Sequence, residues 1–258
     1  MISKNTRLEK IKKIMVQNNR IEVTTLSQLL DVSKVTIRND LKELEAEGFL
    51  MRTHGGATIN TDISQNLQVS FPGSPQAADS DSPLYRIASK AEEITRDNEW
   101  IFLGSGSTCY AIAQALAHKH VQIVTNNLYV STYLAAFPNV NVITCGGKVH
   151  NGRIPFLYGD LALSNISSML FSKAFIGVSG ADFKHGYSVS NDVERNIFKA
   201  LQDCSEKMVI VTESSKFGRA AFMHLEGLDI ADTLITDSGI PDAYKDYYTN
   251  SSTELLLV

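Results

Sequence analysis

The chain reads VSKVTIRNDL at residues 32–41, shortly after the apolar segment TTLSQLL at residues 24–30. This segment predicts a short helix from about Thr25 to Leu30, and Asp31-Val32 predicts a tight turn after it. Ser33 is a good N-cap for a second helix, because its hydroxyl can accept the free N–H groups of a first turn. Two short helices joined by such a turn are the parts of a helix-turn-helix.

The second predicted helix has two faces of different chemistry. Ile37, Leu41 and Leu44 recur at helical spacing and face inward. On the outward face, arginine suits the acceptor edge of guanine, asparagine suits adenine, and lysine and threonine can hold phosphates. From spacing alone, a three-helix bundle with a merely solvated outer face stays open. The residues predicted to contact DNA here are Ser33, Lys34, Thr36, Arg38 and Asn39.

The segment LMRTHGGA at residues 50–57 predicts a β-hairpin directly after these helices. Gly48 can cap the preceding helix, and Gly55-Gly56 can turn the hairpin. Such a hairpin would act as a wing whose tip lies near a phosphate backbone. We therefore predict that Arg52 and His54 support DNA binding from the wing.

Composition is that of an ordinary folded protein, with 43% hydrophobic and 20% charged residues in 258. No stretch approaches the roughly 18 apolar residues of a membrane span, and the N-terminus lacks the apolar core of a signal peptide. We expect a cytoplasmic protein without a membrane partner. The three cysteines and six histidines show no disulfide or metal-ligand spacing. We therefore expect reduced, mostly buried thiols, no metal and no cofactor.

Charge and composition divide the chain into three regions. Residues 1–57 hold ten Lys and Arg against seven Asp and Glu, a net charge of +3, while the rest of the chain carries −7. A basic head on an acidic body hints at a polyanion partner for the head. Residues 58–82 are rich in Ser, Asp, Asn and Gln and read as a linker, in which Leu67, Val69 and Phe71 could form a short strand. Residues 83–258 form the third region.

Short β-branched runs alternate with helical patterns throughout the third region. This alternation predicts an α/β domain with a mostly parallel sheet covered on both faces, and ligands bind such sheets at the carboxyl ends of the strands. The predicted strands are Trp100–Leu103, Gln122–Thr125, Val140–Thr144, Ala174–Val178, Met208–Thr212, Thr233–Thr236 and Glu254–Leu257. The predicted helices are Tyr85–Thr95, Thr108–Ala117, Leu128–Ala136, Leu161–Leu170 and Val193–Leu201.

Small and polar residues follow several of these strands. The segment GSGST at residues 104–108 lies between a strand and a helix, where N–H groups and hydroxyls can converge on an anion. It matches neither the P-loop nor the dinucleotide fingerprint, and an ordinary tight turn stays open. Two lysines beside such a loop suit a phosphate, while Asn and Asp suit sugar hydroxyls. The candidates at the other strand ends are Asn126, Lys148, Asp182 and Lys216.

The N-terminal motif resembles the signature of the DeoR family of bacterial repressors. The resemblance rests on residues 32–41, Leu44-Glu45, Gly48 and Arg52–Ala57, and it spans nearly all of residues 6–57. It implies a winged helix-turn-helix that binds double-stranded DNA. The chain departs from the family pattern at Asn39, where the family usually has a second arginine, and this departure bears on phosphate affinity and operator sequence.

The C-terminal region resembles the sensor domain of the same family, which is similar in fold to ribose-5-phosphate isomerase and the glucosamine-phosphate isomerases. Matching stretches are Leu103–Thr108, Thr125-Asn126, Gly146-Gly147, Gly177–Asp182, Glu194 and Glu213–Gly218. The resemblance implies a phosphorylated sugar or related metabolite as effector, and self-association as a homodimer or homotetramer. The full set of predicted effector-binding residues is Gly104, Ser105, Gly106, Ser107, Thr108, Asn126, Lys148, Asp182, Glu194 and Lys216.

Two other classes of function compete with a regulator. A sugar-phosphate isomerase needs a carboxylate base, and ribose-5-phosphate isomerase carries Asp-Gly-Ala-Asp-Glu where this chain reads SGADF at residues 179–183, so two of three acids are missing. A pure scaffold would leave the hydroxyl-rich loop and the lysines without a ligand. We therefore expect a transcriptional regulator and not an enzyme: a repressor of carbohydrate-metabolism genes, whose operator binding changes when the effector binds.

Overall fold

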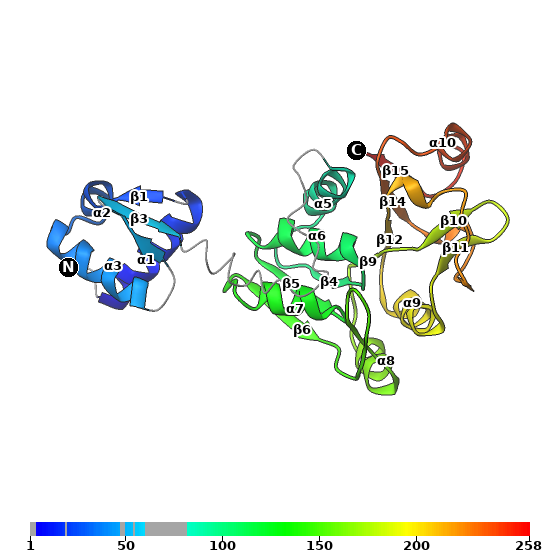
Figure 1. Ribbon diagram of the computed structural model, residues 1–258, viewed down its shortest axis with the longest axis horizontal. Helices are drawn as coiled ribbons and strands as arrows, with labels where there is room; N and C mark the ends of the chain where they lie inside the picture. The colour runs from blue at the N-terminus through cyan, green and yellow to red at the C-terminus, as the bar shows by residue number, and fades with distance from the viewer. Residues whose placement is uncertain (1–3, 19, 47–49, 54, 60–81) are drawn as a thin grey trace. The chain divides into compact units, whose positions relative to one another are not determined.

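A computed structural model describes residues 4–18, 20–46, 50–53, 55–59 and 82–258 of the chain. The chain divides into two units, Met1–Phe71 and Pro72–Val258 (Figure 1). The structure does not determine how the two units are placed relative to one another, and each is taken separately below. Gly48, His54 and the proposed strand residues Leu67, Val69 and Phe71 lie outside the described residues.

The first unit is a winged helix-turn-helix, as the sequence predicts. Among its described residues, helices α1, α2 and α3 pack around Ile11, Met15, Leu26, Ile37 and Leu44, which are fully buried. The described strands of this unit form an antiparallel sheet in the order β1-β3-β2. The elements are α1 (Lys4–Asn18), β1 (Arg20–Glu22), α2 (Val23–Leu30), α3 (Lys34–Ala46), β2 (Leu50–Arg52) and β3 (Gly56–Ile59).

The turn between α2 and α3 has the predicted construction. Asp31 adopts a left-handed conformation with a φ of 52°, and its N–H bonds back to the Ser27 carbonyl, which ends α2. The hydroxyl of Ser33 accepts the N–H of Thr36 at 3.1 Å, so Ser33 caps the N-terminus of α3. Local side-chain chemistry therefore sets both ends of this turn.

Close contact between strands requires a glycine at residue 56. A Cβ atom there would lie 2.1 Å from the carbonyl oxygen of Ile21 in β1. Gly55, its neighbour in the wing, has no atom within 4 Å of the same position. A side chain would therefore fit at residue 55, whereas residue 56 must be a glycine for β1 to approach β3.

The second unit is built on a seven-stranded sheet in which every adjacent pair is parallel. The strand order is β15-β14-β12-β9-β4-β5-β6. All seven strands coincide with strands predicted from the sequence to within two residues at each end. They are β4 (Trp100–Leu103), β5 (Val121–Thr125), β6 (Val140–Thr144), β9 (Lys173–Ile176), β12 (Met208–Val211), β14 (Thr233–Thr236) and β15 (Glu254–Leu257).

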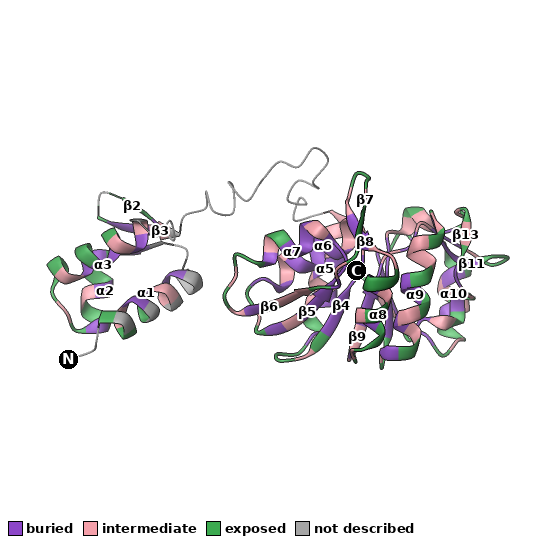
Figure 2. Ribbon diagram, turned by 90° about the horizontal axis from the view of Figure 1, so that it is seen from below, coloured by how far each residue is buried: buried purple, intermediate pink, exposed green. Residues whose placement is uncertain are grey.

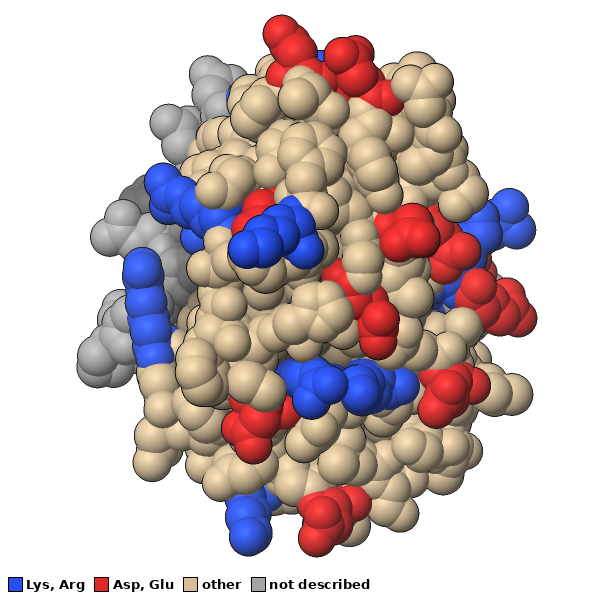
Figure 3. Space-filling view, turned by 90° about the vertical axis from the view of Figure 1, so that its right-hand side faces the viewer, with Lys and Arg blue, Asp and Glu red and all other residues tan. Residues whose placement is uncertain are grey.

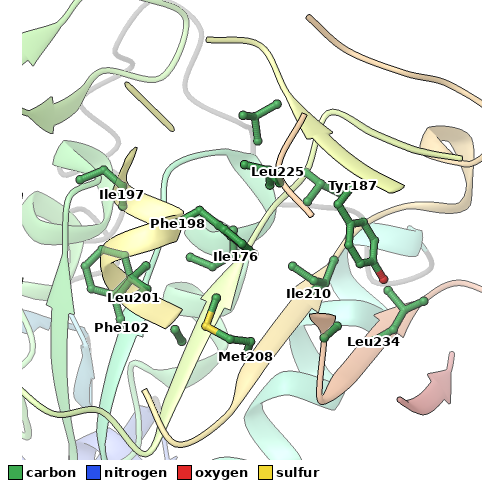
Figure 4. Close-up of a cluster of buried hydrophobic side chains, with 14 of the residues drawn as sticks. Phe102, Ile176, Tyr187, Ile197, Phe198, Leu201, Met208, Ile210, Leu225 and Leu234 are labelled. Carbon is green, nitrogen blue, oxygen red and sulfur yellow. The ribbon is translucent and has the colours of Figure 1, made fainter. Parts of the chain in front are cut away.

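Helices cover both faces of this sheet. Alternate strand residues such as Phe102, Ile176 and Ile210 share one core cluster with side chains from α9 (Figure 4). Side chains from α8 and α10 belong to the same cluster. On the other face α6 packs beside α5 and α7, and the thiol of Cys109 in α6 donates to the Phe175 carbonyl. The helices are α5 (Pro83–Glu93), α6 (Ser107–Leu116), α7 (Leu128–Leu134), α8 (Asp160–Ser167), α9 (Asp192–Cys204) and α10 (Asp242–Thr249).

Strand order reverses between β4 and β9. The chain runs outward from β4 through β5 to β6, then crosses back to β9 and runs the other way through β12 and β14 to β15. In open α/β sheets the crevice for a ligand lies at the carboxyl ends of the two strands where the order reverses. The sheet thus indicates the end of β4, at Gly104, and the end of β9, at Gly177.

Short antiparallel strands complete the second unit and were not among the predicted elements. A hairpin of β7 (Lys148–His150) and β8 (Phe156–Tyr158) follows β6. A separate sheet contains β10 (Gly180–Asp182), β11 (Gly186–Val189) and β13 (Met223–His224). Tyr187 in β11 fixes this sheet to α10, because its hydroxyl lies 2.8 Å from that of Tyr248 in the core.

Candidate functional site

One face of α3 is buried and the opposite face is exposed (Figure 2). Ile37, Leu41 and Leu44 are fully buried. Lys34, Arg38 and Asn39 are exposed, while Thr36 is half-buried and bonded to Ser33. The structure therefore brings the predicted DNA-contact residues of α3 onto its solvent side or its N-terminal turn. Their role in DNA contact stays a prediction.

A buried ion pair joins α1 to α3. The Arg7 Nε donates to one oxygen of the Asp40 carboxylate at 2.5 Å, and a terminal nitrogen donates to the other at 2.9 Å. The two side chains are 12% and 3% exposed. A bidentate pair in this setting fixes the orientation of α3, because breaking it would leave a carboxylate in the core.

A groove of about 420 Å³ lies between α3 and the wing. Arg38 contributes from α3, and Arg52, Thr53, Gly55 and Gly56 contribute from the β2–β3 hairpin. Two cationic side chains thus border one concave surface of the first unit. Arginine side chains beside a helix-turn-helix suit a phosphate backbone.

Arg52 is held in place by Glu45 at the end of α3. Its Nε donates to one oxygen of the Glu45 carboxylate at 2.7 Å, and its backbone N–H donates to the other at 3.1 Å. The side-chain bond from Arg52 lowers the pKa of Glu45. Both groups are more than a third exposed, so this pair orients the wing more than it stabilises the fold.

In the second unit a small cavity lies at the ends of β4 and β9. Its lining includes Gly104 and Ser105 after β4, Gly177 after β9, Asn126 after β5 and Glu194 in the first turn of α9. The apolar part of the lining is Ile176, Val189, Ile197 and Phe198, which the sequence analysis did not select. The position agrees with the crevice expected from the strand order. At about 20 Å³ the cavity is no larger than a water molecule requires, so a larger ligand needs its mouth to open.

The half-buried side chain of Glu194 lines one side of this cavity. It accepts the N–H of Ser190 at 3.2 Å and the amide of Asn191 at 3.2 Å. Its other oxygen accepts the hydroxyl of Ser105 at 3.4 Å, across the cavity. Burial raises the pKa of Glu194, and the bonds from Ser190 and Ser105 oppose that rise. The carboxylate has room in its coordination for a further donor.

Asn126 presents an unused acceptor to the same cavity. Its side chain is 2% exposed, and its amide nitrogen donates weakly to the Leu157 carbonyl at 3.4 Å. Its Oδ1 atom is buried and has no hydrogen-bond partner among the described residues. A buried acceptor without a partner costs about 1–3 kcal/mol, so a ligand hydroxyl bonded there would recover that energy.

Some N–H groups of the loop at residues 104–108 are used in the fold, and others are available to bind a ligand. The N–H of Gly104 donates to the Phe175 carbonyl at 3.0 Å, so it is committed to the link between β4 and β9. Gly106 has a φ of 103° and precedes Ser107, where α6 begins. The N–H groups of Ser107 and Thr108 have no acceptor inside α6, because a helix leaves its first-turn donors unpaired. Those donors, and not that of Gly104, are suited to an anion.

Six of the ten predicted effector residues are not among those that line the cavity: Gly106, Ser107 and Thr108 in the loop after β4, and Lys148, Asp182 and Lys216. Lys148 is exposed in β7. Asp182 ends β10, where its carboxylate accepts the N–H groups of Lys184 and His185 at 2.9 and 2.5 Å, and the His185 side chain is the main cause of its lowered pKa. Lys216 ends a 3₁₀ turn (Ser214–Lys216) after β12, two strands from β4, or about 10 Å across the sheet. Their part in effector binding stays a prediction.

The rest of the surface and interior gives less specific information. On the face seen in Figure 3, acidic and basic side chains are interspersed on a largely uncharged surface. Cys109, Cys145 and Cys204 are free and buried, as expected, and burial raises the pKa of Cys109 to about 12. Within the described ranges, His, Cys, Asp and Glu form no group of three or more that could hold a metal. No described helix has both the length and the apolar character needed to cross a membrane.

Two family models match the chain: the DeoR-like helix-turn-helix domain at residues 7–63 and the DeoR C terminal sensor domain at residues 85–238. The lactose phosphotransferase system repressor of Lactococcus lactis subsp. lactis is 30% identical, over 98% of this chain and 99% of the relative. The glycerol-3-phosphate regulon repressor of Escherichia coli (strain K12) is 28% identical, over 95% of each chain.

Solved structures resemble this chain only distantly. Ribose 5-phosphate isomerase A from Neisseria gonorrhoeae is 23% identical, covers 52% of each chain and has a TM-score of 0.38. The assignment of the chain therefore depends on the two family models and on the full-length relatives.

Proposed function

The chain belongs to the DeoR family of transcriptional regulators, and from that premise we propose that it is a repressor whose sensor domain binds a phosphorylated sugar or a related metabolite. DNA binding belongs to the first unit and effector binding to the second. As a bacterial regulator it would act in the cytoplasm, where the chromosome lies. Residues 1–57, 58–82 and 83–258 are the proposed reader, linker and sensor.

The observation that carries the effector proposal is the polar lining at the reversal of strand order. The Oδ1 atom of Asn126 lacks a donor, and the Glu194 carboxylate, which accepts only a long hydrogen bond from Ser105 on one oxygen, can take a further one; sugar hydroxyls supply such donors. The first-turn N–H groups of Ser107 and Thr108 lie at the start of α6, on the same loop as Ser105. One ligand with hydroxyls and a phosphate would satisfy both requirements.

Chemistry on the bound sugar is not part of the proposal. Among the described residues, Glu194 alone contributes a carboxylate to the cavity lining, and Asp182 is committed to the turn of its own hairpin. Aldose-ketose isomerisation would need a base placed at the reacting carbons together with groups that polarise both oxygens. Ser179 and Phe183 stand at two positions where the isomerase loop has acids.

Two relatives carry names that agree in type with this effector. One is a repressor of a lactose phosphotransferase system and another is a repressor of a glycerol-3-phosphate regulon. For this chain we propose the shared chemistry, a small polyol bearing a phosphate. We further propose a homodimer or homotetramer, because a single recognition helix reads too few base pairs for useful specificity.

A thermal-shift series on the full-length protein tests the proposed function. Each phosphorylated sugar is paired with its unphosphorylated parent and with inorganic phosphate. A ligand that binds only the native state raises the melting temperature, and we expect at least one sugar phosphate to do so while its parent does not. If no phosphorylated sugar or polyol shifts the transition, or if phosphate alone gives the whole shift, the effector class is wrong.

A further inference from the structure

Val35 is an apolar residue on the solvent side of the DNA-reading helix. Its side chain is 64% exposed, more than that of any other large hydrophobic residue described in the first unit. Isolated exposed apolar residues are common on protein surfaces and need no special explanation. The position of Val35 on α3 is what distinguishes it.

Helical geometry places Val35 on the line opposite the buried stripe of α3. Successive residues turn by about 100°, so Val35 lies about 160° from Ile37 and 180° from Leu44, both of which are fully buried. Asn39 follows one turn later and Lys42 two turns later, and both are exposed. The three side chains therefore form one outward row, with the apolar one nearest the N-terminus of α3.

Two polar neighbours of Val35, Ser33 and Thr36, are hydrogen-bonded to each other. Ser33 and Thr36 share a hydrogen bond between their hydroxyls at 2.9 Å, and the Ser33 hydroxyl also accepts the Thr36 N–H. Both side chains are therefore committed to the start of the helix. Recognition helices contact base edges with their N-terminal residues. In the first turn of α3, the side chain of Val35 faces outward and takes no part in the hydrogen bonds that cap the helix.

We infer that Val35 reads thymine, through contact between its methyl groups and the C5-methyl of a thymine in the major groove. A valine has no donor or acceptor for a base edge, and the thymine methyl is the apolar feature that the major groove presents. Residues one turn apart on a helix lie about 5–6 Å from each other. The thymine should therefore be at or next to the base that Asn39 contacts. The inference rests on the proposed reader role of α3.

Deoxyuridine scanning tests this inference, because uracil lacks the methyl group and keeps every hydrogen-bonding atom of thymine. The probe is a duplex that the full-length protein itself selects from a random-sequence library. Each thymine is replaced singly by deoxyuridine, and affinity is measured by fluorescence anisotropy. For wild type we expect one position per half-site at which the replacement weakens binding about fourfold, the value of one buried methyl-sized group.

Coupling between protein and DNA identifies the contact. Val35→Ala should weaken binding to the thymine duplex by about the same factor, and at that position it should no longer distinguish uracil from thymine. Alanine favours helix more than valine does, so the variant keeps α3 intact. Leu29→Ala is the matched control: Leu29 is 61% exposed on α2, and its replacement should leave the response to deoxyuridine unchanged.

The outcomes separate this inference from the reader role itself. If sequence-specific binding persists and every deoxyuridine that weakens wild type weakens Val35→Ala equally, Val35 does not contact a thymine methyl and the reader role stands. If no replacement weakens wild type, the inference is also overturned. If the full-length protein selects no sequence at all, the reader role fails and the inference fails with it.

Discussion

Ser105 and Glu194 are 89 residues apart in sequence, and the hydroxyl of one donates to the carboxylate of the other at 3.4 Å across the cavity between β4 and β9. The contact links the loop after the first strand of the sheet to the first turn of α9. It is long for a hydrogen bond to a carboxylate. A ligand hydroxyl inserted between the two groups could bond to both, which is how we expect the effector to open the cavity.

Replacing Glu194 by Gln tests whether partial burial of the charged carboxylate destabilises the folded chain. The pKa of Glu194 is higher in the folded chain than in the unfolded chain. At a pH between these two pKa values, the folded state keeps the proton and the unfolded state has released it. Stability from this group therefore falls as pH rises through that interval. Glu194→Gln should be more stable relative to wild type at about pH 7 than at about pH 4. Urea unfolding across pH measures the difference; a difference that does not change with pH contradicts the assignment.

The two glycines of the wing should respond differently to a methyl group. Gly56→Ala places a Cβ at 2.1 Å from the Ile21 carbonyl oxygen, and such overpacking costs about 1–3 kcal/mol. Gly55→Ala meets open space and should change stability by less than about 0.5 kcal/mol. Thermal unfolding of the full-length variants compares them. Equal effects at the two positions would mean that β1 does not approach β3 as described.

Removing one partner of the buried ion pair between Arg7 and Asp40 should destabilise the fold strongly. Arg7→Ala leaves the Asp40 carboxylate, 3% exposed, without its bidentate partner, and we expect a loss of about 3 kcal/mol or more in the free energy of unfolding. Arg7→Ala combined with Asp40→Ala should cost less than the sum of the two single changes. Strict additivity in a double-mutant cycle would show that the two groups do not interact.

Regular elements could be predicted because their apolar patterns are complete. β4, β6, β14 and β15 occupy the predicted ranges without change, since parallel strands covered on both faces read as short apolar runs. The strands β10 and β13 read GAD and MH and have no such pattern. α10 was missed because only Tyr244 and Tyr248 among its residues are buried, too few for a helical period.

The position of the cavity could be predicted from the sequence, but only some of the residues that line it could be. Gly104 and Ser105 of the loop after β4 line the cavity together with Asn126 and Glu194, and the rule about strand ends led to all of these but Glu194. Phe198 and Val189 line it too, but from sequence they cannot be told from core residues. Asp182 was chosen for its carboxylate, whereas the turn after it supplies two nearby N–H donors that use that group locally.

Arg38 is the residue on which we expect base reading to depend most. It is exposed on α3 and borders the groove shared with the wing. Arg38→Ala should weaken binding to the selected duplex by about 1–3 kcal/mol and relax the preference for guanine at one position. Wild-type affinity should also fall steeply with salt concentration as phosphate contacts release counterions. Unchanged affinity in a folded Arg38→Ala protein would overturn this role.

Operator affinity with and without a phosphorylated sugar tests the central claim most directly. The full-length protein is titrated onto its selected duplex by fluorescence anisotropy, alone and with the sugar phosphate that gives the largest thermal shift. We predict that this ligand weakens duplex binding by wild type and has no effect on Lys216→Ala, which should bind the duplex normally without ligand, because a lysine beyond β12 can supply the cation that a phosphate dianion requires. Identical duplex affinities with and without every sugar phosphate in the series would contradict the claim that this chain is a metabolite-controlled regulator.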